Sequence, residues 1–240
     1  MRIKIFTPND PDVSFPDPML AYSELSNSIP SNAKIDNTFL NYGDLGDTIA
    51  IGGDLSPERL VAAYQKGIFP FFSFRSEPIT WSCPLQRFVI FAQEIHISHS
   101  MCSLMNSGRY HVTFDTNFEA IIRGCATHNN RIKSKYAWLG PQMISSYIRL
   151  HQLGHAHSVE VWTNGNLIGG LYGVSVGHCF CGESMFSILP NASKFALVNL
   201  AHHLQNLDGA YIIDCQYHTP HLASMGGRLI SYPQYISYLS

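Results

Sequence analysis

The sequence is poor in charged residues and contains no long apolar run. Only 13% of its 240 residues are charged, against about 25% in typical globular domains. Because 45% are hydrophobic, the composition excludes a disordered chain. No 18 consecutive residues are apolar, which argues against a membrane-spanning helix, and the first residues lack the apolar core of a secretory signal. We therefore expect a soluble, cytoplasmic protein.

The sequence also lacks an excess of charge of either sign. Fifteen Lys and Arg against seventeen Asp and Glu leave a formal charge of -2, so there is no global basic field to attract nucleic acid. A local cluster is present at Arg131, Lys133 and Lys135, close to Tyr136 and Trp138. Its spacing is compatible with a solvated loop or with a local nucleic-acid contact.

Cysteines and glycines do not occur in the spacings that indicate common cofactor sites. The six cysteines have no framework spacing, so we expect reduced thiols. His155 and His157 share a face of one predicted strand, as do Cys179 and Cys181 of another, and four such ligands could close a zinc site. One-residue spacing on strands more often turns ligands apart, so we expect no metal. No glycine run matches a phosphate-binding loop or a dinucleotide fingerprint, and a serine nucleophile elbow is missing.

The order of the predicted elements indicates an α+β protein. Residues 1 to 48 resemble a loop-rich leader, and Ser56 with Pro57 begins a helix that Gly67 ends. Thr116 and Glu119 form a predicted capping box for a second helix. The remaining predicted elements are a helix at 141–151, strands at 157–162, 167–176 and 178–186, a helix at 193–207 capped by Ser193, a strand at 211–216, a short helix from 219 and a strand at 228–231. Asn164 and Gly165 form a predicted hairpin turn between the first two strands. This order predicts a mixed sheet with helices on both faces. We place a domain boundary near residue 110, giving domains 1–110, a small α/β unit, and 111–240.

Glu183 is the most unusual residue of the predicted sheet. It lies in FCGESMFS, surrounded by Phe180, Met185 and Phe186, and an unpaired charge in a core costs several kcal/mol. An apolar pocket with a carboxylate at its mouth would suit a hydrophobic amino acid whose α-ammonium group needs a counter-ion. The sequence therefore predicts such a pocket at Glu183.

Asp214 and Gln216 form a second candidate pair. They are two residues apart on a predicted strand, so we expect their side chains on one face of the sheet. A carboxylate beside an amide can accept a hydrogen bond from an attacking amine and orient it. The same pair is equally compatible with a strand-end cap or a buried hydrogen-bonded pair.

Four stretches carry a resemblance to a known family. They are IAIGGDLSPERLVAAYQKGIFPFFS (49–73), GHAHSVEVW (154–162), FCGESMFS (180–187) and IDCQYHTPHLASMGG (213–227). Together they resemble the bacterial leucyl/phenylalanyl-tRNA–protein transferases, in order, from residue 49 to about 230. The resemblance implies a small N-terminal domain and a C-terminal domain with an acetyltransferase-like (N-acyltransferase) fold.

The resemblance also implies the reaction. Leucine, phenylalanine or methionine is moved from the 3′ end of aminoacyl-tRNA to the α-amino group of proteins that begin with Arg or Lys, which marks them for N-degron degradation. No metal or organic cofactor is implied, and we expect a monomer without a membrane partner.

Site residues follow from the resemblance position by position. Gln216 is expected to withdraw a proton from the attacking amine, while Asp214 polarises it or holds the basic N-terminal residue. The expected substrate contacts are Glu183 and Ser184 at the aminoacyl group, Phe180, Leu171, Leu197 and Ile213 around its side chain, and Phe71 and Trp138 at the terminal adenine. Phe71 replaces the family's Trp, and Leu200 and Leu204 replace family aromatics, which should enlarge the pocket.

Two other functions remain as alternatives. An acyl-CoA N-acyltransferase could share the fold, but it needs a glycine-rich pyrophosphate turn where this chain has Pro190 to Lys194. A noncatalytic module that binds the tRNA end is the second alternative.

Overall fold

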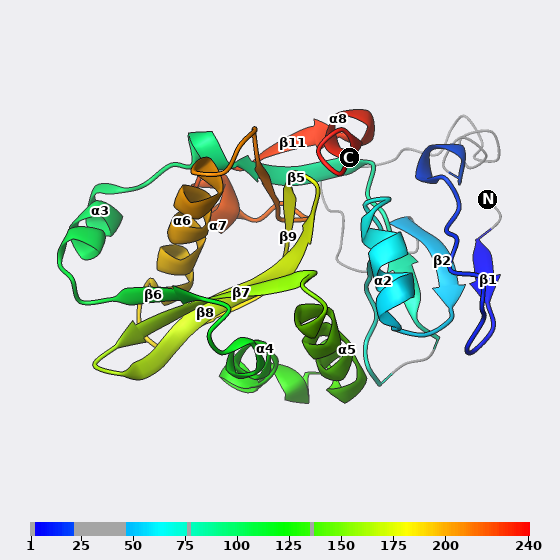
Figure 1. Cartoon of the computed structure of the whole chain (residues 1–240), viewed down its shortest axis with the longest axis horizontal. Coiled ribbons are helices and arrows are strands. Elements are labelled where there is room, and N and C mark those ends of the chain that lie inside the picture. Colours follow the sequence, from blue (N-terminus) through cyan, green and yellow to red (C-terminus); the bar gives the residue numbers. More distant parts are fainter. Residues whose placement is uncertain (1–2, 22–46, 76–77, 135–136) are drawn as a thin grey trace.

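The computed structural model describes residues 3–21, 47–75, 78–134 and 137–240, which form two β-sheets with helices (Figure 1). Lys135 and Tyr136 of the predicted basic loop lie outside the described residues, as does most of the predicted leader. No helix in the described part of the chain is long and apolar enough to cross a membrane.

The smaller sheet is built from the N-terminal part of the chain. Its strand order is β1 (Lys4–Phe6), β2 (Thr48–Gly52), β4 (Thr80–Ser82) and β3 (Phe69–Pro70), with β1 parallel to β2 and the other pairs antiparallel. Helix α2 (Pro57–Tyr64) begins at a proline, as predicted, because proline at the first helical position loses no hydrogen bond. Its apolar residues Leu60 and Ala63 are buried in the core.

The larger sheet has seven strands in the order β11-β5-β10-β9-β8-β7-β6. Their bounds are β5 (Gln86–Phe91), β6 (His111–Phe114), β7 (Ala156–Thr163), β8 (Asn166–Val176), β9 (Cys179–Ser187), β10 (Ile212–Asp214) and β11 (Arg228–Ser231). Strand β10 is parallel to β9 and antiparallel to β5, and the other neighbours are antiparallel. The α+β class with a mixed sheet is therefore confirmed.

Helices cover both faces of the larger sheet (Figure 1). Helices α4 (Phe118–Thr127) and α5 (Pro141–Gln152) pack on one face, in a core that continues into the smaller sheet. Helix α6 (Ala192–Gln205) packs on the other face and connects β9 to β10. Shorter elements are η2 (Ala92–Glu94), α3 (His99–Asn106), η3 (His128–Lys133), α7 (Pro220–Ala223) and α8 (Tyr232–Ile236).

The larger sheet includes one strand from the N-terminal part of the chain. Strand β5 precedes residue 110 in sequence yet lies inside the larger sheet, between β11 and β10. The boundary at residue 110 stays a prediction.

Two predicted helix caps are wrong. Helix α4 is capped by Asn117, whose Oδ1 accepts the Ala120 N–H at 3.2 Å, and not by Thr116. Helix α6 begins at Ala192 after Asn191, so Ser193 lies inside its first turn. In both cases a neighbouring Asn takes the cap position, as its preference for caps and left-handed backbone allows.

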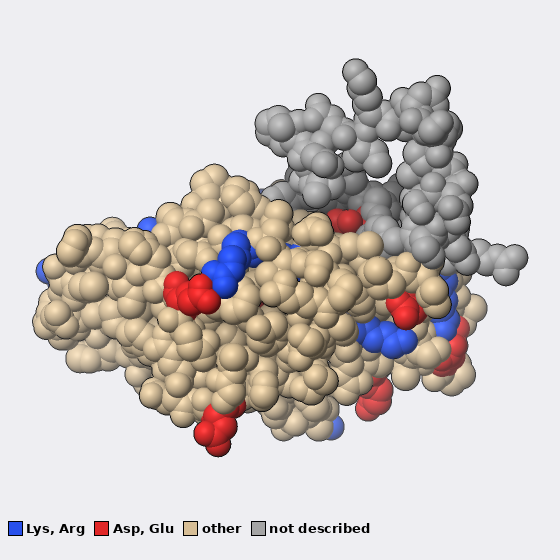
Figure 2. Space-filling model, turned by 90° about the horizontal axis from the view of Figure 1, so that it is seen from above, with Lys and Arg blue, Asp and Glu red and all other residues tan. Residues whose placement is uncertain are grey.

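Charge is sparse on the surface as well. On the face shown in Figure 2, Lys and Arg occur in small separate groups, several of them beside Asp or Glu. This distribution agrees with the expectation that any nucleic-acid contact is local.

Candidate active site

Glu183 is the extra residue of a β-bulge between β8 and β9. Gly182 pairs with Gly173 and Ser184 pairs with Tyr172, so Glu183 has no partner residue on β8. Bulges re-aim side chains and are common beside active sites. The charge that the sequence places among apolar residues is thus accommodated by a local irregularity of the strand.

The bulge also reverses the alternation of side chains along β9. Cys181, before the bulge, and Phe186, after it, both lie in the core with α4 and α5. Phe180 and Met185, also on opposite sides of the bulge, both pack against the core formed with α6. Without the extra residue, an odd separation would place each of these pairs on opposite faces.

Two tyrosine hydroxyls and one amide donate hydrogen bonds to the Glu183 carboxylate. Tyr64 of α2 donates to Oε1 at 2.7 Å, Tyr147 of α5 donates to Oε2 at 3.2 Å, and the Gln216 amide donates to Oε1 at 3.2 Å. The two tyrosine hydroxyls also lie within hydrogen-bonding distance of each other. The carboxylate therefore joins the smaller sheet's helix to the larger sheet.

Burial raises the pKa values of Glu183 and of the two tyrosines that contact it. Loss of solvent raises the pKa of Glu183 to about 7, against the lowering effect of the hydrogen bonds from Tyr64 and Tyr147. Burial, and next the charge of Glu183, raise the pKa of both tyrosines well above 10.0, so they remain hydrogen-bond donors. Glu183 can consequently exchange a proton near neutral pH.

Asp214 is held by three contacts at the end of β10. Its Oδ2 lies 3.1 Å from Arg87 Nε and accepts the Tyr235 hydroxyl at 2.9 Å. Its Oδ1 accepts the Gln216 backbone N–H at 2.7 Å. Arg87 and Asp214 are each only 1% exposed, so the pair is a buried ion pair.

The prediction that Asp214 and Gln216 share one strand face is wrong. Strand β10 ends at Asp214, and Gln216 adopts a left-handed backbone with φ of 61°. The Asp214 carboxylate therefore faces Arg87 and Tyr235, while the Gln216 amide faces Glu183. The alternative of a strand-end cap describes this local geometry, because the Asp214 carboxylate accepts the Gln216 backbone N–H directly after β10.

An apolar cavity of about 150 Å³ opens beside Glu183. It brings together most of the predicted substrate contacts, namely Leu171, Phe180, Leu197, Ile213, Glu183 and Ser184, together with Asp214. Leu200 also lines it, whereas Leu204 lies on the wall of a separate cavity of about 340 Å³. Leu200 borders this second cavity as well, so it lies between the two cavities, while Leu204 does not line the apolar one.

An aromatic cavity of about 160 Å³ adjoins the apolar one. Phe71, Trp138, Tyr217 and Gln216 line it, and it shares Glu183 with the apolar cavity. Every predicted site residue thus lines one of two cavities that meet at Glu183.

Comparison with known proteins identifies the family. The model described as leucyl/phenylalanyl-tRNA protein transferase matches residues 89–240, and its N-terminal domain model matches residues 53–85. The chain belongs to this family.

Relatives named leucyl/phenylalanyl-tRNA–protein transferase cover most of its length. The protein of Chromohalobacter salexigens is 50% identical over 191 residues, which span 80% of this chain and 73% of that protein. The protein of Syntrophus aciditrophicus is 51% identical over 76% of this chain and 75% of its own length. A solved structure of a conserved Bacteroides thetaiotaomicron protein of unknown function covers 65% of this chain and 55% of its own, with 9% identity and a TM-score of 0.44.

Several residues of the site carry no local sequence signal. Tyr64 and Tyr147 follow the ordinary apolar spacing of their helices, and Arg87 follows a stretch without periodicity. Their importance comes from contacts with residues far away in the chain. Only the fold makes those contacts visible.

The four His and Cys residues that could have formed a zinc site do not come together. Among the described residues, the one group of three potential ligands within 4.8 Å is Cys179, Cys181 and Asp214, with no histidine. His157 instead contacts Asp115 at 2.7 Å. Asp214 is already paired with Arg87, whose positive charge disfavours a metal cation there.

Proposed function

We propose that this enzyme transfers leucine, phenylalanine or methionine from aminoacyl-tRNA to the α-amino group of proteins that begin with Arg or Lys. The observation that carries the proposal is the meeting of an apolar and an aromatic cavity at one carboxylate. The apolar cavity takes the amino-acid side chain, and the aromatic one takes the terminal adenosine. The ester that joins these two groups then lies beside Glu183 and Gln216.

The size and lining of the apolar cavity support the donor class. Its volume of about 150 Å³ and its aliphatic and aromatic walls suit an unbranched or γ-branched apolar side chain. A misfitted methylene-sized group costs roughly 1–3 kcal/mol in such a pocket. We therefore assign Leu171, Phe180, Leu197 and Ile213 to recognition of the donor side chain.

The hydrogen bonds around Gln216 support its role at the reacting amine. Its side-chain N–H donates to Glu183, which leaves the amide oxygen available to accept from the attacking amine. Asp214 already accepts from Tyr235 and the Gln216 backbone and pairs with Arg87, so we assign it to positioning Gln216. As the peptide bond forms, the ester C–O bond breaks, and the amine proton passes to the ribose oxygen.

The aromatic cavity supports recognition of the tRNA end. Phe71 and Trp138 present rings on its walls, and stacking of one base on an aromatic side chain is worth about 1–3 kcal/mol. Phe71 offers less area than an indole, so the contribution of Trp138 should be the larger.

Three further expectations belong to this proposal. We propose an acetyltransferase-like fold for the C-terminal part, supported by the mixed sheet and the β9-α6-β10 connection. We also propose a monomer acting in the cytoplasm, where aminoacyl-tRNA and acceptor proteins meet. Acceptor choice for Arg and Lys is supported by the carboxylate of Glu183 close to the proposed ester position.

The test is incorporation of labelled leucine from leucyl-tRNA into peptides that begin with Arg or with acetylated Arg. Only the free α-amine should gain leucine, and Gln216→Ala should lower turnover more than tRNA binding. Gln93→Ala, an exposed site on η2, is the matched control. Label on both peptides, or on neither, would reject the proposal. Transfer from acetyl-CoA instead would favour an acyl-CoA enzyme, and tRNA binding without transfer would favour a noncatalytic module.

A further inference from the structure

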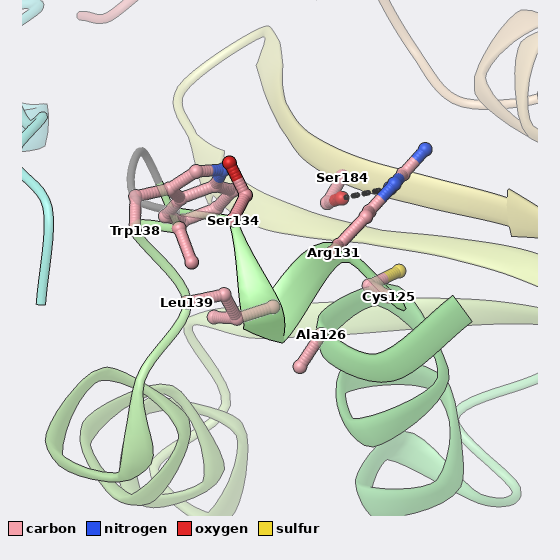
Figure 3. A pocket seen from close by; sticks show the side chains of 8 residues that line it. Cys125, Ala126, Arg131, Ser134, Trp138, Leu139 and Ser184 are labelled. Atoms are coloured by element: carbon pink, nitrogen blue, oxygen red, sulfur yellow. Dashed lines mark hydrogen bonds between the residues drawn. The ribbon is translucent and has the colours of Figure 1, made fainter. Parts of the chain in front are cut away.

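A third cavity, of about 170 Å³, adjoins both parts of the candidate active site. It shares Trp138 with the aromatic cavity and Ser184 with the apolar cavity. Figure 3 shows Arg131 and Trp138 on opposite sides of this space, with Ser184 beside the guanidinium group. The cavity therefore lies next to the proposed position of the terminal adenosine, but none of the roles assigned above uses it.

Arg131 supplies the charge of this cavity and is held in place by β9. Its Nη1 donates to the Met185 carbonyl at 3.0 Å and lies 3.5 Å from Ser184 Oγ. These two residues directly follow the bulge at Glu183. The guanidinium group is consequently held close to the bulge that carries the Glu183 carboxylate.

A second arginine fixes the loop that carries Arg131. Arg75 donates through Nη1 to the Ser134 carbonyl at 2.8 Å and through Nη2 to the Ile132 carbonyl at 2.7 Å. Its guanidinium group also stacks over Phe74, 4.2 Å from the ring centroid. Both arginines therefore hold a surface loop at the edge of the cavity, and only Arg131 lines it.

The composition of the cavity selects an anion over a basic group. None of the described residues that line it is acidic, and Arg131 is the one described lining residue with a positive charge. An acceptor's N-terminal Arg or Lys would be repelled there. A guanidinium group matches the geometry of phosphate oxygens and stays charged at any working pH.

We infer that Arg131 binds the phosphodiester that joins the terminal adenosine of the donor tRNA to the preceding nucleotide. This inference rests on the proposed function. Trp138 lines both the aromatic cavity and the cavity of Arg131. Its ring contacts the adenosine in the aromatic cavity, and the 5′-phosphate of that nucleotide lies in the cavity of Arg131. The site would offset the repulsion between the phosphate and Glu183.

The test uses two non-reactive donor analogues that differ only at the 5′ position. Both are 3′-leucylamido-adenosine, one with a free 5′-hydroxyl and one with a 5′-methylphosphate that carries a single charge. Binding is measured by calorimetry, which does not depend on turnover. In the unaltered protein we expect the phosphate to strengthen binding about tenfold.

In Arg131→Ala that gain should fall to less than about twofold, with the affinity of the hydroxyl analogue unchanged. Arg131→Lys should retain part of the gain, because a point charge still attracts phosphate. Arg123→Ala removes the same charge from the exposed face of α4 and should keep the full gain. Thermal unfolding of each variant checks that the fold is kept.

Three results would overturn the inference. The first is that the 5′-methylphosphate does not strengthen binding to the unaltered protein. The second is that it still strengthens binding in Arg131→Ala, and the third is that both analogues lose affinity equally in that variant. Equal loss would mean that Arg131 only supports the pocket. Failure of the proposed function is distinguishable, because leucyl-tRNA would then give no transfer while analogue binding would still be measurable.

Discussion

Replacing Glu183 with glutamine should stabilise the protein at alkaline pH and leave its stability unchanged at acidic pH. Burial raises the pKa of this carboxyl from 4.5 to about 7. Between these pH values the folded protein holds a proton on Glu183 that the unfolded chain releases. The contribution of the neutral carboxyl is therefore fully present below pH 4.5 and is lost as the pH rises through about 7.

The size of the effect follows from the same shift. For a fully desolvated carboxyl it corresponds to about 3 kcal/mol. Because Glu183 lies at the mouth of two cavities and is only partly buried, we expect about 1–2 kcal/mol after solvent screening. Glutamine resembles the protonated form, so Glu183→Gln should gain that amount at pH 8 and almost nothing at pH 4.

The assay is urea unfolding of both proteins from pH 4 to pH 8, with the difference in free energy of unfolding plotted against pH. Histidines titrate equally in both proteins and cancel in the difference. Glu119→Gln, on the exposed face of α4, is the control and should stay within about 0.5 kcal/mol at every pH. A flat difference for Glu183→Gln, or one that falls with pH, would refute the reasoning about burial.

Three further predictions concern the surroundings of Glu183. Arg87→Met should lower the free energy of unfolding by about 3–5 kcal/mol, because Asp214 is left buried without its cation; a loss below 1 kcal/mol in urea unfolding would contradict this. Gln216→Gly should be about 1 kcal/mol more stable than Gln216→Ala, because φ is 61° there, and equal midpoints would argue against a left-handed turn. Leu200→Phe should fill part of the apolar cavity and reduce transfer of phenylalanine relative to leucine about tenfold, and an unchanged ratio would remove Leu200 from the pocket.

Local signals in the sequence were sufficient for most of the elements. Pro57 marks the start of α2, and Asn164 with Gly165 forms the turn between β7 and β8, with φ of 48° and 75°. Such signals depend on residues within a few positions of one another, so they can be interpreted without the fold. Predictions failed where neighbours competed, as at the caps of α4 and α6, where Asn117 and Asn191 take the place of Thr116 and Ser193.

The sequence predicted which residues belong to the candidate site, but not how their side chains are oriented. Motifs in the sequence singled out Glu183, Asp214 and Gln216, and the structure places all three on cavities that meet at Glu183. Their orientation was not predictable, because it depends on the bulge in β9 and on the end of β10. Both features are set by pairing with other strands.

The amino-acid order by itself determined the helices, the strands, the hairpin turn and the choice of an acid and an amide, since each depends on short-range backbone preference or residue chemistry. Only the tertiary structure decided which groups surround the acid. Tyr64 lies 119 residues before Glu183 and donates to it directly, and Arg87 of β5 pairs with Asp214 at the end of the neighbouring strand β10. No local pattern encodes such contacts, because protonation and hydrogen bonding depend on distances that exist only after the chain has folded.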